Sequence, residues 1–209
     1  MSSDSRVAPR KAASSRATAA AVWPPSVRVR IVIASDIVED LSRAAIGATF
    51  NFYRDGERAA LCCRRLAAYL EAHREAPILL VGEAPGYRGT RISGIPFTSE
   101  RQLTGAGPAE VTATIVHRVL TQLCLEQEVL LWNVVPTHPG TASSNRQPTR
   151  TEVDAGRPFL HALARGRRPV AVGRLAHAAI GGPYVRHPAH GGAIRFARDL
   201  ETVSASMRR

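Results

Sequence analysis

The chain of 209 residues is long enough for one sizeable α/β core and gives no reason to expect a second domain. Its apolar fraction of 44% is ordinary, and no apolar run approaches the roughly 18 residues of a membrane-spanning helix, so we expect no contact with a membrane. The net charge of +11 favours a partner with a phosphate backbone. A coding bias toward arginine is the alternative, since Lys11 is the only lysine.

The three cysteines, Cys62, Cys63 and Cys124, argue against two common cysteine chemistries. Their odd number disfavours a secreted disulfide framework, and no C-x-x-C pair is present to begin a zinc or cluster site. We therefore expect three reduced side chains, no bound metal and a cytoplasmic location.

The first 26 residues differ from the rest in composition. They are rich in Ser, Ala and Arg and carry too few large apolar side chains to offset the entropy of folding. Residues 1–26 are therefore predicted to be a flexible basic arm, which either tethers the protein to DNA or has no role. Residues 27–209 are predicted to form one domain.

Short apolar runs typical of strands alternate with amphipathic spacing typical of helices along this domain. The expected strands cover residues 27–34, 78–81, 129–134, 169–172 and 184–186. The expected helices cover about 37–48 after the capping residue Asp36, then 57–76, 109–125, a stretch from 151, 174–180, and a stretch from 192. This alternation predicts the α/β class, as a three-layer α/β/α sandwich around a short, twisted, parallel sheet of about four strands.

Three loops with unusual residues follow three of the expected strands. Residues 82–86 (Gly-Glu-Ala-Pro-Gly) end a continuous apolar run that is typical of a strand buried on both faces, while 133–136 and 187–192 follow two later strands. Because the carboxyl ends of parallel strands meet at one edge of a sheet, where ligands bind in such folds, these loops are expected to form one site.

These loops, together with 94–97 (Gly-Ile-Pro-Phe), resemble the motifs of the uracil-DNA glycosylase superfamily over about residues 37–197. Residues 145–149 and 157–160 add similarity to the branch that usually carries an iron-sulfur cluster. The resemblance implies a monomeric, monofunctional DNA glycosylase that hydrolyses the bond between deoxyribose and a uracil flipped out of DNA. The four cysteine ligands of that branch are missing, so we expect no cluster and no other cofactor.

The resemblance also assigns roles within the base pocket. It implies that Phe97 stacks on the base and that His187 stabilises the negative charge on the departing base, and Asn133 carries an amide that can both donate to a carbonyl oxygen and accept from a ring N–H. Gly82, Ala84 and Gly86 are expected to line the pocket. A core phenylalanine, a packed or surface histidine and an asparagine that caps a turn are the alternatives.

Two departures from the family pattern leave roles open. Related branches carry a general-base aspartate where this chain has Ala84, so Glu83 is expected either to serve the water or the sugar cation or, as the alternative, to hold loop N–H groups. Ala189 replaces a serine that helps to hold a phosphate. We therefore expect DNA contacts from Arg146, His190 and the backbone of Gly191 and Gly192.

Three other functions are compatible with the sequence. A glycosylase for another deaminated base, hypoxanthine or xanthine, would use the same pocket. A non-catalytic DNA-binding relative would explain the substitutions at Ala84 and Ala189. A hydrolase that binds a small phosphate through 82–86 is disfavoured, because no Lys followed by Ser or Thr stands at the spacing of a P-loop.

Overall fold

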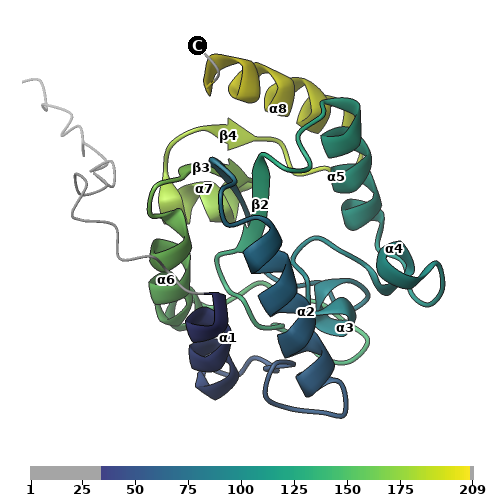
Figure 1. Ribbon diagram of the computed structural model, residues 1–209, viewed down its shortest axis with the longest axis vertical. Helices are drawn as coiled ribbons and strands as arrows, with labels where there is room; N and C mark the ends of the chain where they lie inside the picture. The colour runs from purple at the N-terminus through teal and green to yellow at the C-terminus, as the bar shows by residue number, and fades with distance from the viewer. Residues whose placement is uncertain (1–33, 208–209) are drawn as a thin grey trace, which may run out of the picture.

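The structure is a computed structural model that describes residues 34–207, which form a four-stranded parallel sheet between two layers of helices (Figure 1). The expected arm 1–26 lies outside the described residues. So does the expected strand 27–34, except for Ala34, which begins helix α1 (Ala34–Arg43). Within 34–207, every helix is too short or too polar to cross a bilayer.

The sheet has the strand order β2-β1-β3-β4, with every neighbouring pair parallel. Its strands are β1 (Ile78–Gly82), β2 (Val129–Asn133), β3 (Arg168–Val172) and β4 (Tyr184–Val185). Both β1 and β2 are buried along their whole length, which is why their sequences show no polar alternation. The register places Gly82 opposite Asn133, so two of the expected site residues lie side by side.

Helices cover both faces of the sheet, which confirms the predicted three-layer sandwich. Side chains of α1, α2 (Ala59–Ala72), α6 (Arg150–Ala164) and α7 (Arg174–Ile180) share a core with Leu79 and Val81 of β1. Side chains of α5 (Val111–Gln122) and α8 (Ala193–Met207) share a second core with Ile78 and Leu80. Successive residues of β1 therefore serve opposite layers.

The segment 82–108 contains two short helices that the sequence did not indicate. They are α3 (Thr90–Ser93) and α4 (Glu100–Thr104), and each is ended by a glycine in the left-handed conformation, Gly94 and Gly105. Helices of four or five residues show no apolar periodicity, so the sequence pattern, which gave no helix between residues 82 and 108, missed both.

Candidate active site

A cavity of about 330 Å³ opens at the carboxyl edge of the sheet. It brings together eight residues expected at the site: Glu83, Ala84, Gly86, Phe97, Asn133, Arg146, His187 and His190. Its other lining residues are Pro85, Thr90, Glu110, Thr112, Ala113, Pro139, Asn145 and Ala189. Loops that lie far apart in the sequence therefore meet at one edge of the sheet, as the parallel topology predicts.

Gly82 lies against two residues that line the cavity, Phe97 and Asn133, and is not itself part of the lining. A β-carbon at this position would overlap Cζ of Phe97 and lie 2.8 Å from Oδ1 of Asn133, so only glycine allows the ring and the amide to meet there. Phe97 has a φ of +53°, a strained value for a residue other than glycine, and is 9% exposed. Asn133 is 3% exposed, although its side chain makes no hydrogen bond to another residue within 34–207. A buried amide that faces a cavity is suited to a ligand edge with both donors and acceptors.

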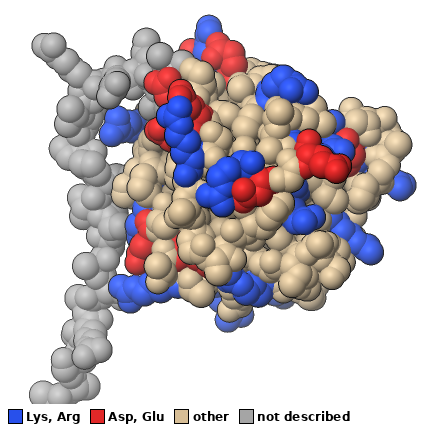
Figure 2. Space-filling view, turned by 90° about the horizontal axis from the view of Figure 1, so that it is seen from below, with Lys and Arg blue, Asp and Glu red and all other residues tan. Residues whose placement is uncertain are grey.

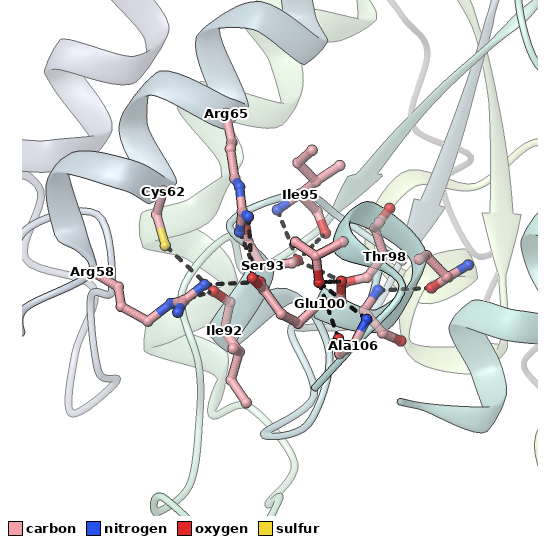
Figure 3. A network of polar contacts seen from close by, with 12 residues as sticks. Arg58, Cys62, Arg65, Ile92, Ser93, Ile95, Thr98, Glu100 and Ala106 are labelled. Carbon is pink, nitrogen blue, oxygen red and sulfur yellow. Dashed lines mark hydrogen bonds and ion pairs between the residues drawn. The ribbon is translucent and has the colours of Figure 1, made fainter. Parts of the chain in front are cut away.

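A network of polar contacts holds the segment that carries Phe97 (Figure 3). Arg65 of α2 donates to both carboxylate oxygens of Glu100, at 2.8 and 3.1 Å, and Arg58 forms an ion pair with the same carboxylate. The hydrogen bond from Arg65 lowers the pKa of Glu100. Ser93 Oγ donates to the carbonyl of Thr98 at 2.6 Å. These contacts fix both ends of the segment on α2, which stabilises the strained backbone of Phe97 between them.

His187 follows β4 as a neutral donor. The backbone N–H of Ala189 donates to its Nδ1 at 3.2 Å, so the proton of the neutral ring is on Nε2. Burial lowers the pKa of His187, and the charges of His190 and Arg186 add to the effect. The ring can therefore offer an Nε2–H to an oxygen in the cavity at neutral pH.

Glu83 presents a carboxyl group to the same cavity. Its backbone carbonyl accepts a hydrogen bond from Val135 N at 3.1 Å, which continues the pairing of β1 with β2. Its carboxyl accepts no hydrogen bond from any described residue, so it does not hold the N–H groups of its own loop. Burial raises the pKa of Glu83. A half-buried carboxyl without a protein partner is available to water or substrate.

The loop after His187 is only partly in the cavity. His190 is exposed, lines the cavity and has a φ of +52°. Gly191 and Gly192 stand outside the lining, and the N–H of Gly192 donates to the carbonyl of Ala189 at 3.1 Å. A β-carbon on Gly192 would overlap the carbonyl oxygen of His187. Gly192 thus shapes the turn at His187, and phosphate binding by this loop stays a prediction.

The family model of the uracil DNA glycosylase superfamily matches residues 70–206. The chain belongs to the uracil-DNA glycosylase superfamily. Its fold is similar to the crystal structure of wild-type SMUG2 from Pedobacter heparinus, with a TM-score of 0.60 and 12% identity over 83% of this chain and 97% of that one. No curated protein sequence matches the chain. Membership of the superfamily places the chain among DNA glycosylases, a class of hydrolases in DNA repair.

Arg146, expected to bind DNA in this superfamily member, is held by Glu152. Its guanidinium donates to both carboxylate oxygens of Glu152, which also accept from the N–H groups of Thr149 and Ala48 at 2.8 and 3.2 Å. The hydrogen bond from Arg146 is the main reason that the pKa of Glu152 falls to about 2. Arg146 therefore has a structural partner, and it lines the cavity from a fixed position.

The sequence did not single out three residues at the cavity: Asn145 and Glu110 line it, and His138 contacts the lining residue Pro85. His138 is fully buried, with Nδ1 2.8 Å from the carbonyl oxygen of Pro85 and Nε2 2.8 Å from that of Thr141. Asn145 accepts a hydrogen bond from Tyr87 N at 2.9 Å. Both connect the long loop after β2 to the loop after β1. The third residue, Glu110, lies directly before α5. The only sequence feature that could have pointed to it is that glutamate is not a favoured residue at the N-terminus of a helix.

The residues do not fit the iron-sulfur cluster of the related branch. Cys62 and Cys63 are neighbours on α2, and their thiols donate to the carbonyls of Ile92 and Tyr53. Cys124 is exposed beyond the end of α5. Within 34–207 no three His, Cys, Asp or Glu side chains are close enough to hold a metal ion.

Proposed function

We propose that the protein is a monofunctional DNA glycosylase that releases uracil. The observation that carries the proposal is the buried Asn133, whose amide faces the cavity beside the ring of Phe97. Uracil offers a carbonyl oxygen and a ring N–H on adjacent atoms of one edge, and a single amide can pair with both. The same edge of cytosine has an amino group and a bare ring nitrogen, which reverses the pattern and disfavours cytosine.

The remaining side chains supply the chemistry of such a reaction. Phe97 gives a flat apolar surface on which a flipped base stacks. As the bond between C1′ and the base nitrogen breaks, its electron pair moves to the base, and His187 Nε2–H donates to the base oxygen that becomes negative. Glu83 serves the attacking water or the positive charge on the sugar. The base then takes a proton from solvent, so hydrolysis is complete without a covalent intermediate.

Contacts with the DNA backbone are expected near the loop after β4. Figure 2 shows one face of the molecule, on which arginine side chains lie beside carboxylates, so this face carries no uniform basic field. Arg195 and Arg198 of α8 are exposed and form no ion pair within 34–207. They stand close in sequence to His187 and His190, and we propose that they neutralise phosphates beside the flipped nucleotide.

The test is an assay of base release from matched oligonucleotides that contain uracil, hypoxanthine or xanthine. We expect uracil to be released fastest, and Asn133→Ala and His187→Ala to lower the rate at least 100-fold with the fold intact by circular dichroism. Glu126→Gln, a carboxyl outside this cavity, is the control and should retain the wild-type rate. Faster release of hypoxanthine or xanthine would assign that base, instead of uracil, as the substrate. Salt-sensitive DNA binding without release of any base would refute the proposed glycosylase activity.

A further inference from the structure

Glu110 is a second carboxyl in the active-site cavity, and the mechanism above does not use it. It precedes the first residue of α5 but does not cap the helix, because its side chain makes no hydrogen bond to the helix N–H groups. Its own N–H donates to Ser99 Oγ at 2.9 Å, and its carbonyl accepts from Thr114 N at 3.0 Å. The backbone is therefore fixed while the carboxyl is turned toward the cavity.

The loop after β1 leaves space for this carboxyl. A β-carbon on Gly86 would overlap Oε1 of Glu110, and a β-carbon on Gly89 would overlap Oε2. Gly86 has no positive φ, so the nearby carboxyl is what favours glycine there, while Gly89 also has φ −106° and ψ −112°, outside the regions that L side chains prefer. At both positions glycine lets the carboxyl lie against the loop backbone.

The carboxyl of Glu110 is without a partner in the described part of the chain. It takes part in no hydrogen bond or ion pair there, and burial raises its pKa. Burying a carboxyl without a partner costs stability, so such a group is expected where a ligand will supply the partner. Burial also raises the pKa of Glu83, the other carboxyl that lines the cavity.

We propose that Glu110 is a catalytic carboxyl that faces the deoxyribose of the flipped nucleotide and stabilises the positive charge formed on the sugar as the base leaves. This inference rests on the proposed glycosylase activity but not on which base is released. The C1′–N bond breaks with its electron pair going to the base, and the oxygen of water then bonds to C1′. The proton of that water passes to a cavity carboxylate and then to solvent.

The first experiment measures single-turnover release of uracil from DNA by the full chain, from pH 5 to 9. Glu110→Gln keeps the shape of the side chain and removes its charge. We expect its rate to fall about 100-fold while its Kd for the same DNA stays within about twofold. The fall in the wild-type rate toward low pH should be less steep in this variant, since one carboxyl has been lost. Glu126→Gln, the control outside this cavity, should match the wild type in rate and pH profile.

Thermal unfolding separates catalysis from structure. Because the carboxyl has no protein partner, Glu110→Gln should unfold at the wild-type temperature or above it. A rate within threefold of the wild type, or a loss of rate matched by a loss of stability, would overturn the proposal. Glu110→Ala provides a second test, because added formate should restore part of its rate if a carboxylate is what the site lacks.

The second experiment does not depend on the base. It compares the affinity of the chain for DNA that contains a positively charged pyrrolidine abasic nucleotide with its affinity for DNA that contains the neutral tetrahydrofuran analogue. We expect the wild type to prefer the cation at least tenfold and Glu110→Gln to lose most of this preference. An equal preference in both proteins would refute the role of Glu110. If the wild type releases no uracil but the preference depends on Glu110, the assignment of uracil fails and that of the carboxyl stands.

Discussion

Replacing Glu152 with glutamine tests whether one buried carboxylate holds the outer wall of the active site. Glu152 is 1% exposed and accepts hydrogen bonds from Arg146, Thr149 and Ala48, so it joins α6, the loop after β2 and the segment after α1. Its pKa is lowered from 4.5 to about 2, with the hydrogen bond from Arg146 as the largest cause. Glutamine keeps the volume but presents an amide that cannot accept both guanidinium N–H groups.

The magnitude follows from the shift in pKa. A decrease of roughly 2.5 pKa units at about 1.36 kcal/mol each corresponds to about 3 kcal/mol of stability at pH 7. Because the side chain of Arg146 is 37% exposed, solvent screens part of this interaction, and we expect Glu152→Gln to lose about 2–3 kcal/mol. The folded pKa is below the unfolded one. The contribution is therefore complete above about pH 4.5 and is lost as the pH falls toward 2.

The assay is urea unfolding of both proteins at pH 7 and at pH 3.5. The difference in free energy of unfolding should be about 2–3 kcal/mol at pH 7 and smaller by roughly 1 kcal/mol at pH 3.5, where most of Glu152 is protonated in the unfolded state. Asp154→Asn is the matched control on the same helix. That side chain is 52% exposed in its ion pairs with Arg150 and Arg157, so we expect a loss of at most about 0.5 kcal/mol. Equal losses in the two variants, or a difference that does not depend on pH, would refute the reasoning.

Three further predictions concern the cavity and its rim. Gly82→Ala should lower base release at least tenfold, because its β-carbon would displace Phe97 and crowd Asn133, and a wild-type rate in a folded variant would contradict this geometry. Ile194→Ala should slow release from duplex DNA about tenfold and from single strands less than twofold. The reason is that the Ile194 side chain, 77% exposed on the first turn of α8, can fill the space that a flipped base leaves in the duplex. Equal effects on both substrates would exclude that role. The rate should also fall at low pH, when His187 gains a second proton. Because burial lowers the pKa of His187, this fall should begin only below the usual pH range of histidine, and an NMR titration of the ring checks this.

The strands could be predicted because the sheet is covered on both faces. Continuous apolar runs located β1 and β2 to within one residue, and the helix expected from residue 151 begins at Arg150. Positions in short helices could not be predicted in this way. The bounds of α3 and α4 depend on glycine C-caps and on the contacts of Glu100 with α2, which are properties of the folded chain.

The residues of the candidate site also differ in whether the sequence could place them. Glu83, Asn133 and His187 follow strands, so the parallel topology alone brings them to one edge of the sheet. Glu110 and His138 come from the start of a helix and the middle of a long loop. Their positions depend on how α5 and the loop after β2 pack against 82–89, and the sequence pattern does not predict that packing.

The alanine at position 84 has a physical explanation if Glu110 is considered together with the loop after β1. Ala84 packs against the apolar core that includes Leu79 and Val81, so a carboxylate there would lose hydration against aliphatic neighbours. Glu110 reaches the same loop from the position directly before α5, where Gly86 and Gly89 leave room for it. A sugar cation is stabilised by a carboxylate that lies close to it, whichever element carries that carboxylate. Under our proposal, the carboxylate that stabilises the sugar cation therefore comes from Glu110 at the start of a helix instead of from position 84 after a strand, and the chemistry of the cavity is retained.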